Sequence, residues 1–417
     1  MKLAIIGAGV SGLVVAHLLS PEHDVTLFEA GAHPGGHVNT IRVDTADETH
    51  HVDTGFIVFN DRNYPGFQRL LTRLRVATQP SSMTFGVSDG RGDFEYNGAT
   101  PNGLFAKRAH LATPWFHRMV ADLARFQRAA RELVASGVSG EDGPSLGEWL
   151  ERQRFSRPFI ERLIVPQASA VWSADPAQMW SFPAGFLAQF FDNHGMLSLR
   201  GRPRWRTVTG GSARYVEALL AGFGGRLRLR TPVVSVTRHP GGVQLTPRGG
   251  DPEPFDEVVL AAHSDQALAL LRDATDREHE LLGAIPYQRN EAVLHTDTRM
   301  LPRRRRAWAS WNCHLLERSD HRTTVTYHMN RLQSLDAREQ LCVTLNRTGE
   351  IDPDRVIETI DYAHPVYTAA GVAAQRRVAE IDGRGHTHFC GAYWGWGFHE
   401  DGVQSALRVA ARFGARL

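Results

Sequence analysis

Three glycines near the start of the chain have the spacing of a nucleotide-binding turn. Gly7, Gly9 and Gly12 follow an apolar stretch at 2–6 and lead into 13–20, where apolar residues have helical spacing. In this pattern the first glycine permits a tight turn, the second lets a pyrophosphate approach the backbone, and the third lets the helix pack closely on the strand. Free N–H groups at the start of the helix would then bind the phosphates.

An acidic residue follows at the position where a dinucleotide fold needs one. Residues 24–28 have the composition of a second strand, and Glu29 comes directly after it, about 20 positions beyond Gly7. Such an acid accepts hydrogen bonds from the ribose hydroxyls. Strand, glycine turn, helix, strand and acid therefore predict a dinucleotide site rather than the glycine-rich turn of an ordinary α/β domain.

The residues that follow extend this fingerprint. Gly35-Gly36, followed by Thr40, resembles the second half of the FAD signature of the amine oxidase and phytoene desaturase superfamily. Many members of that superfamily have arginine after the two glycines. This chain has His37, which weakens a charge contact with the phosphates but keeps a hydrogen-bond donor. Residues 52–55, Val-Asp-Thr-Gly, resemble the strand that runs beneath the flavin ring in that superfamily. The resemblance implies that the dinucleotide is FAD.

Later segments match the same superfamily in the expected order: a glycine turn at 208–212 before a helix at 213–221, strands at 231–236 and 255–263, and C-terminal stretches at 389–393 and 397–403. In relatives, the residue at the position of Val233 holds the adenine through its backbone. The C-terminal motif places the start of a helix under the flavin. The resemblance thus implies an FAD site made of Gly7, Gly9, Val10, Ser11, Gly12, Glu29, Ala30, Gly36, His37, Thr54, Gly55, Val233, Gly391, Ala392, Phe398, His399 and Val403.

The motifs predict an α/β fold of two domains, as in amine oxidase-like flavoproteins. A discontinuous Rossmann-like FAD-binding domain takes residues 1–70, 205–285 and 380–417, and an α+β substrate domain takes 71–204 and 286–379. The length of 417 residues suits this organisation.

Local patterns predict several elements of these domains. Residues 114–136 have the spacing of one amphipathic helix, and Ser145 to Glu148 form a capping box before the next helix. Residues 323–346 alternate as antiparallel strands do, and 239–254 have the composition of a hairpin or loop.

A closer resemblance covers essentially the whole chain. The segments 54–60, 193–198, 295–312, 327–335 and 397–402 resemble a bacterial branch of predicted NAD/FAD-binding proteins. Members of that branch are often encoded beside cyclopropane-fatty-acid synthases, and in plants are fused to them. The resemblance implies chemistry on a lipid acyl chain and a lipid methyltransferase as partner.

The distribution of lysine bears on the substrate. Amine oxidases of the superfamily usually carry a lysine that holds a water near the reactive flavin nitrogen. Here lysine occurs only at Lys2, inside the first strand, and at Lys107, in a polar stretch before a helix. Amine oxidation is therefore disfavoured, although Tyr393, Trp394, Trp396 and Phe398 cluster where an aromatic cage for an amine would stand.

Candidate substrate-binding residues lie in the middle of the chain, and candidate catalytic residues lie there and further towards the C-terminus. Aromatic residues suited to a hydrophobic tunnel, or to ordinary core packing, are Trp172, Trp180, Phe182, Phe186, Phe190 and Phe191. His194 follows them in a turn-like position and suits either general acid–base catalysis or a structural role. Tyr327 and Tyr393 are further catalytic candidates.

Three hypotheses follow for the function. The first is a flavoenzyme of the oxidase or desaturase type acting on a fatty acyl chain. The second is an oxidase, desaturase or isomerase of another apolar molecule, such as a polyene. The third is an FAD-containing accessory subunit of a lipid methyltransferase. No second glycine motif for NADPH is present, so reduction by a bound nicotinamide is not expected.

Composition excludes other classes of partner. The net charge of +2, from 47 basic and 45 acidic side chains, gives no reason to expect nucleic acid. Three cysteines without a CxxC pair predict a reducing cytoplasm, and the scattered histidines predict no metal site. No apolar stretch is long enough to cross a membrane.

A run of four arginines, Arg303–Arg306, lies close to Trp308 and Trp311. It suits peripheral contact with anionic lipids at the inner membrane face, or a solvated charged loop.

Overall fold

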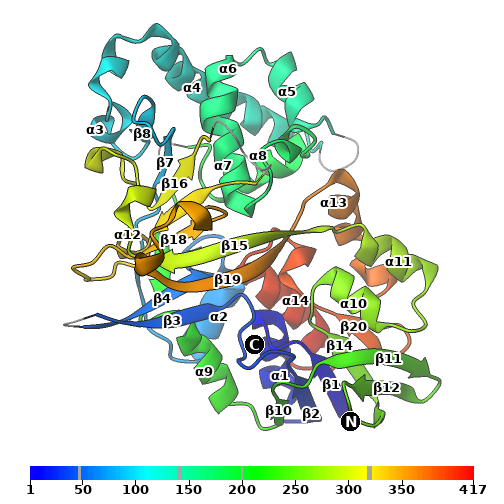
Figure 1. Ribbon diagram of the computed structural model, residues 1–417. Helices are drawn as coiled ribbons and strands as arrows, with labels where there is room; N and C mark the ends of the chain where they lie inside the picture. Colours follow the sequence, from blue (N-terminus) through cyan, green and yellow to red (C-terminus); the bar gives the residue numbers. More distant parts are fainter. Residues whose placement is uncertain (46–47, 139–142, 199–200, 317–321) are drawn as a thin grey trace.

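A five-stranded parallel sheet carries the nucleotide motif. The computed structural model describes residues 1–45, 48–138, 143–198, 201–316 and 322–417. The strand order is β10-β2-β1-β14-β20, with β1 (Lys2–Ile6) at the centre (Figure 1). The other strands are β2 (Asp24–Phe28), β10 (Arg226–Arg228), β14 (Glu257–Leu260) and β20 (Thr387–Phe389).

Both faces of this sheet are buried, which explains the unbroken apolar sequence of β1. Leu3 and Ile5 pack in one hydrophobic cluster, and Ala4 and Ile6 pack in another, because successive side chains of a strand point to opposite faces. The first cluster contains residues of α1 (Val10–Leu19), α2 (Pro65–Arg73), α9 (Ala213–Ala221) and α14 (His399–Arg412). The second contains residues of β11 (Val233–His239), β12 (Gly242–Pro247), β13 (Glu253–Phe255), α10 (Ser264–Leu270) and α11 (Asp276–Gly283).

A seven-stranded mixed sheet forms the other half of the protein, in the order β19-β15-β18-β17-β16-β7-β8. Strands β16 and β7 pair in parallel, and the other described neighbours pair antiparallel. The strands are β7 (Phe85–Ser88), β8 (Glu95–Asn97), β15 (Tyr287–His295), β16 (Trp311–His314), β17 (Val325–His328), β18 (Cys342–Leu345) and β19 (Val356–Pro365). Two short helices follow strands of this sheet in the chain: α12 (Met329–Leu332) comes after β17, and α13 (Ala369–Arg376) comes after β19.

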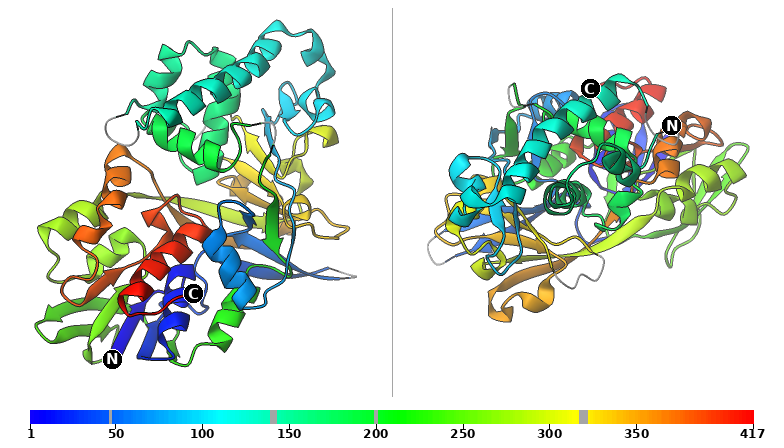
Figure 2. Two further views of the ribbon diagram at one scale, coloured as in Figure 1. Left: turned by 180° about the vertical axis from the view of Figure 1, so that it is seen from behind. Right: turned by 90° about the horizontal axis from the view of Figure 1, so that it is seen from above.

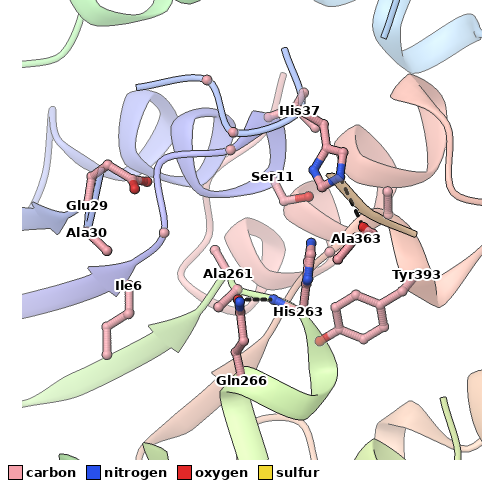
Figure 3. A pocket seen from close by; sticks show the side chains of 18 of the residues that line it. Ile6, Ser11, Glu29, Ala30, His37, Ala261, His263, Gln266, Ala363 and Tyr393 are labelled. Atoms are coloured by element: carbon pink, nitrogen blue, oxygen red, sulfur yellow. Dashed lines mark hydrogen bonds between the residues drawn. The ribbon is translucent and has the colours of Figure 1, made fainter. Parts of the chain in front are cut away.

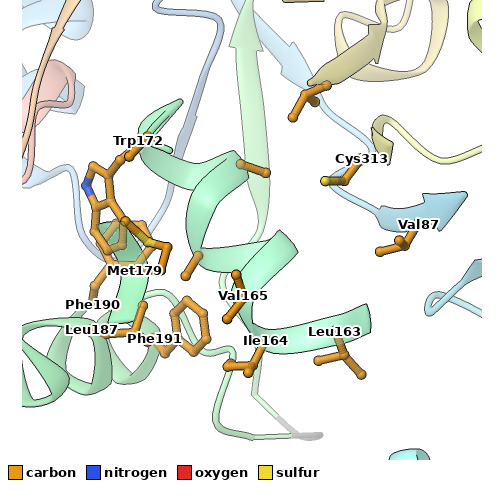
Figure 4. Packing of buried hydrophobic residues seen from close by; sticks show 14 of the residues in the cluster. Val87, Leu163, Ile164, Val165, Trp172, Met179, Leu187, Phe190, Phe191 and Cys313 are labelled. Carbon is orange, nitrogen blue, oxygen red and sulfur yellow. The ribbon is translucent and has the colours of Figure 1, made fainter. Parts of the chain in front are cut away.

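A group of helices packs beside the seven-stranded sheet, at the end of the molecule opposite the two termini (Figures 1 and 2). They are α3 (Pro101–Leu104), α4 (Pro114–Ala135), α5 (Leu146–Arg152), α6 (Arg157–Phe159), α7 (Val165–Trp172) and α8 (Ala184–Asn193). A π-helical turn over Ile160–Ile164 joins α6 to α7. Side chains of α7 and α8, such as Trp172, Phe190 and Phe191, form a hydrophobic cluster with residues of the sheet, such as Val87 and Cys313 (Figure 4).

The predicted fold class is confirmed. Every strand of the five-stranded sheet falls within 1–70, 205–285 or 380–417, and every strand of the seven-stranded sheet falls within 71–204 or 286–379. Two smaller sheets lie alongside: the hairpin of β3 (Asn39–Asp44) and β4 (Thr49–Gly55), and the sheet of β5 (Val58–Asn60), β9 (Trp205–Val208) and β6 (Thr78–Pro80).

Several predicted elements occur where the patterns placed them. Helix α4 ends one residue before the predicted end, and both hydrogen bonds of the Ser145–Glu148 capping box are present. The stretch 239–254 contributes to the antiparallel sheet β11-β12-β13. The predicted strands at 323–346 are β17 and β18, separated by α12.

Candidate functional site

A cavity of about 770 Å³ lies at the carboxyl ends of the parallel strands (Figure 3). Ile6 and Phe28 line it and end β1 and β2, Ala261 lines it directly after β14, and Gly391 lines it two residues after the end of β20. Ligands of open α/β sheets bind at this edge. We call it the nucleotide cavity.

The glycine motif forms one wall of the nucleotide cavity. Helix α1 begins there, and its N-cap residue Gly9 offers no side-chain hydrogen bond to the first turn. A Cβ on Gly12 would overlap the carbonyl oxygen of Gly7, so glycine is required for the close packing of α1 on the strand. Gly36 has φ +61°, and a Cβ there would lie 3.3 Å from the Cα of Gly9. The wall is therefore backbone, which suits a pyrophosphate.

Glu29 and Val233 line the same cavity. The Glu29 carboxylate accepts hydrogen bonds from the backbone N–H of Ala8 at 2.8 Å and of Gly31 at 2.7 Å. These contacts fix the carboxylate at the cavity wall, where it can also accept from ribose hydroxyls.

A second, smaller cavity of about 150 Å³ adjoins the nucleotide cavity. The two share His37, Phe56, Tyr362, His364, Pro365 and Gly397 as lining residues. We call the second one the junction cavity. Thr54, Gly55, Phe398 and His399 line it, so the strand β4 and the start of α14 meet there, as the FAD motifs imply.

A third cavity of about 470 Å³ extends from the junction cavity into the helical part of the protein. These two share Val58, Val171, Trp311 and Phe398. Phe126, Leu163, Ile164, Phe190 and Phe191 line the third cavity, which we call the apolar cavity. The three cavities are thus contiguous through shared walls.

A family model described as flavin-containing amine oxidoreductase matches residues 10–305. The chain belongs to this family. FAD is the family's cofactor, and the glycine wall, the uncapped start of α1 and the position of Glu29 all fit it.

Individual relatives of the family are distant. A protein of Mycobacterium tuberculosis designated a flavin-containing monoamine oxidase, AofH, is 26% identical over 263 residues, which is 61% of this chain and 55% of AofH. A coproporphyrinogen III oxidase of Staphylococcus aureus is 25% identical over 187 residues, 42% of this chain and 37% of that protein. The matched region therefore spans about half or less of the length of these relatives.

Solved structures share the fold over nearly the whole chain. A cyclohexylamine oxidase of Brevibacterium oxydans superposes with a TM-score of 0.70 at 16% identity, covering 99% of this chain and 98% of that chain. A fatty acid isomerase of P. acnes that produces CLA superposes with a TM-score of 0.68 at 16% identity, with the same coverage. At these identities the similarity shows the fold of the family, not a shared substrate.

The predicted FAD residues fall into three groups. Most line the nucleotide cavity, namely Gly7, Gly9, Val10, Ser11, Glu29, Ala30, Gly36, His37, Val233, Gly391 and Ala392. Thr54, Gly55, Phe398 and His399 line the junction cavity. Gly12 and Val403 line neither: Gly12 lies against Gly7, and Val403 is fully buried in the core between α14 and its neighbours.

The structure separates the three predicted catalytic residues. Tyr393 lines the nucleotide cavity, Tyr327 lines the junction cavity, and His194 lines the apolar cavity. His194 is buried at the end of α8, and its Nδ1 donates to the Phe190 carbonyl at 2.9 Å. Of the three, only Tyr327 borders the space between the nucleotide cavity and the apolar cavity.

The aromatic residues predicted between 172 and 191, and the aromatic cluster predicted between 393 and 398, are also distributed over different cavities and the core. Phe190 and Phe191 line the apolar cavity, and Trp172 lines the junction cavity, whereas the Trp180 side chain is 42% exposed. Phe182 and Phe186 pack in the hydrophobic core and line none of the three cavities. Of the C-terminal cluster, Trp396 and Phe398 line the junction cavity.

The two lysines lie outside all three cavities. Lys2 packs over the Phe255 ring at 4.4 Å, and the Lys107 ammonium donates to the Asp93 carbonyl at 2.7 Å. The arginine run is tied to β8, since the backbone N–H groups of Arg303 and Arg304 donate to the carboxylate of the buried Glu95. Among the described residues no set suits a metal ion, and no described helix could span a membrane.

His364 is not part of any sequence motif, yet it lines both the nucleotide and the junction cavity. Asn346 donates to the Asn290 side-chain oxygen at 2.8 Å, and the Asn290 amide nitrogen donates to the Ser173 carbonyl at 3.2 Å. The same amide nitrogen lies 2.9 Å from Nδ1 of His364, so Nδ1 must accept. The proton of neutral His364 is therefore on Nε2, which makes it a donor.

Burial holds the histidines of the cavities neutral. Desolvation lowers the pKa of His37, His194 and His263 to about 4, and the pKa of His364 and His399 to about 3, from an ordinary value of 6.5. In the unfolded chain these groups bind protons below pH 6.5, whereas in the folded protein they do not until about pH 4. Their contribution to stability is therefore lost as the pH falls from 6.5 towards 4.

Two buried carboxyl groups act in the opposite direction. Burial raises the pKa of Asp53 and of Asp401 to about 7, so below pH 7 the folded state binds these protons more tightly than the unfolded chain.

Because the buried imidazoles outnumber these two carboxyl groups, we expect the Tm of the holoprotein to fall as the pH is lowered from 6.5 to 4. Thermal unfolding followed by circular dichroism across this range measures it. A Tm that stays constant or rises there would contradict the assignment of neutral buried histidines.

Proposed function

We propose that the protein is an FAD-dependent oxidoreductase of the oxidase or desaturase type, and that its substrate is the acyl chain of a lipid. The observation that carries the proposal is the apolar cavity, which adjoins the junction cavity and through it the nucleotide cavity. A long apolar chain could lie in the apolar cavity with its end at the junction. Bound FAD supplies a two-electron acceptor for hydride.

The chain's own residues would orient the substrate and keep water away. Val171, Trp311 and Phe398 line both the apolar and the junction cavities, and we call this shared stretch the neck. Its largely apolar surface offers few hydrogen bonds to water. Tyr327, T-shaped against Trp311 at 4.9 Å, narrows the junction cavity further. Burial raises the pKa of Tyr327, so its hydroxyl stays protonated at neutral pH.

The same walls disfavour an amine substrate. The described residues that line the junction and apolar cavities include no lysine and no carboxylate. A lysine-held water near the flavin is therefore not supplied by this chain, and an ammonium group would find no counter-ion. Carriage of the acyl chain on a phospholipid, with a lipid methyltransferase as partner, is the more specific form of the proposal, supported by the branch motifs at 54–60 and 397–402.

Product analysis tests the proposal. The FAD-loaded protein is incubated in air with phospholipids that carry unsaturated, methyl-branched or cyclopropane acyl chains, and the released chains are analysed by mass spectrometry. We expect one class to lose two hydrogens, as oxidation or desaturation of the chain requires; a chain of unchanged mass with a moved double bond would instead support an isomerase. Peroxide release with amines, together with unchanged acyl chains, would contradict the proposal.

A further inference from the structure

One arginine stands at the rim of the apolar cavity. Among the described residues that line this cavity, Arg202 is the sole arginine, lysine or carboxylate. Its side chain is exposed, as are Gly98 and Ala99, which also line the cavity. The other lining side chains are buried or partly buried. The cavity therefore has an apolar interior and a positively charged rim.

Most N–H groups of the Arg202 guanidinium have no hydrogen-bond partner among the described residues. Its Nε donates to the Ser198 carbonyl at 2.9 Å, and no described carboxylate forms an ion pair with it. The neighbouring arginines are engaged differently: Arg204 lies 4.0 Å from the Asp61 carboxylate, and Arg206 donates to Thr78 at 2.9 Å and 2.8 Å. Neither of these two lines the apolar cavity. Arg202 thus combines a place at the cavity with hydrogen-bond donors that no described residue is seen to use.

The chemistry of the walls restricts the ligand. A charged group would lose several kcal/mol of hydration on entering an interior lined by residues such as Leu163, Phe190 and Phe191, so only the apolar part of a ligand can enter. Its polar end must stay at the rim. A guanidinium there attracts an anion and repels an ammonium group, and its planar fork matches a carboxylate or a phosphate.

We propose that the apolar cavity takes an acyl chain that ends in an anionic group, a carboxylate or a phosphate, and that Arg202 holds this group at the rim. The inference rests on the proposed function in taking the chain to be acyl, and it adds the charge of the other end. It also sets the direction of entry: the apolar end of the chain leads towards the junction cavity, and the anionic end stays outside.

Binding by the FAD-loaded protein tests the proposal without turnover. Isothermal titration calorimetry compares oleate with oleyl alcohol, below their aggregation concentrations. We expect oleate to bind about tenfold more tightly than the alcohol, because its carboxylate gains charge-assisted hydrogen bonds. Arg202→Gln should remove this preference, Arg202→Lys should keep part of it, and added salt should weaken oleate alone.

Matched controls separate the outcomes. Arg204→Gln removes an exposed arginine of the same loop that does not line the cavity, and it should leave the preference intact. Equal binding of oleate and oleyl alcohol by the wild type, or an equal loss in Arg204→Gln, would overturn the role of Arg202 while the proposed function stands. No binding of either compound would sink both.

Binding to lipid vesicles distinguishes a lipid phosphate from a free carboxylate as the anion. Binding to phosphatidylglycerol vesicles but not to the zwitterionic phosphatidylcholine vesicles, abolished by Arg202→Gln, identifies the phosphate of an anionic lipid headgroup without a choline as the anion. Oleate binding that depends on Arg202, with no vesicle binding, identifies a free carboxylate. Vesicle binding that is unchanged in Arg202→Gln would contradict the placement of a phosphate at this residue.

Discussion

Gly36→Val is expected to leave the purified protein without bound FAD. Gly36 has φ +61°, a conformation that costs a β-branched residue about 1–2 kcal/mol or more. Its new side chain would also lie against the Cα of Gly9, in the wall where the pyrophosphate is to bind. Overpacking adds about 1–3 kcal/mol. The backbone cost lowers stability, whereas relief of the overlap must displace the wall that is to contact the pyrophosphate, which should weaken FAD binding by roughly 100-fold or more.

The measurement is the flavin content of the purified protein and its Kd for FAD after reconstitution. Gly90→Val serves as the control, because Gly90 has a similar φ of +71° but open space around it and no place in the nucleotide cavity. It should show a comparable cost in stability with FAD content unchanged. If Gly36→Val retained full flavin, the nucleotide cavity would not be where the pyrophosphate binds.

Val171→Trp is expected to block the substrate without disturbing the cofactor. Val171 lines both the junction and the apolar cavity but not the nucleotide cavity. A tryptophan there would fill the neck through which an acyl chain must pass to reach the flavin end. Because displacement of a reacting group by about 1 Å can cost 100-fold in rate, we expect flavin reduction by an acyl lipid to slow by roughly that factor or more.

Stopped-flow reduction under anaerobic conditions gives the rate, and the absorption spectrum gives the flavin content of each variant. Val171→Ala widens the same neck and should keep a rate close to that of the wild type, at a cost of about 1–2 kcal/mol in stability. Val171→Phe is an intermediate block if the tryptophan variant folds poorly. Unimpaired reduction in both the Trp and the Phe variant would show that the substrate reaches the flavin by another route.

The nucleotide half of the site could be predicted because its requirements are local. Gly7, Gly12 and Gly36 are needed by turns and close approaches that a few consecutive residues define, and the acid Glu29 follows at a nearly fixed distance. The strands β1 and β2 have the predicted bounds because a sheet buried on both faces requires unbroken apolar runs.

The substrate half could be predicted only in outline because its walls come from distant segments. Phe182 and Phe190 belong to one aromatic run, yet only Phe190 lines the apolar cavity, and which side of the chain faces a cavity depends on tertiary packing. His364 lies in β19, where its place is fixed by pairing with Gln288 of β15. The available signal was weak: Tyr362 and His364 alternate along the strand and both line the junction cavity.

The proposed role of Arg202 could not be predicted from the sequence for a different reason. The segment 200–206 contains several arginines, and composition does not distinguish them. Only the cavity separates Arg202 from Arg204 and Arg206, which bond to Asp61 and Thr78. The proposed role of Arg202 depends on the apolar cavity beside it. The walls of that cavity include residues of α4, α7 and α8, which come together only when the chain folds.

Oxidation of an acyl chain at the flavin of this protein is tested most directly by the visible spectrum of the flavin. Purified FAD-loaded protein is mixed without oxygen with phospholipids that carry unsaturated, methyl-branched or cyclopropane acyl chains. We expect the flavin absorption bands to bleach with one of these classes and not with amines. Bands that remain unchanged with every acyl lipid would contradict oxidation of an acyl chain, and bleaching with an amine would identify an amine as the substrate instead.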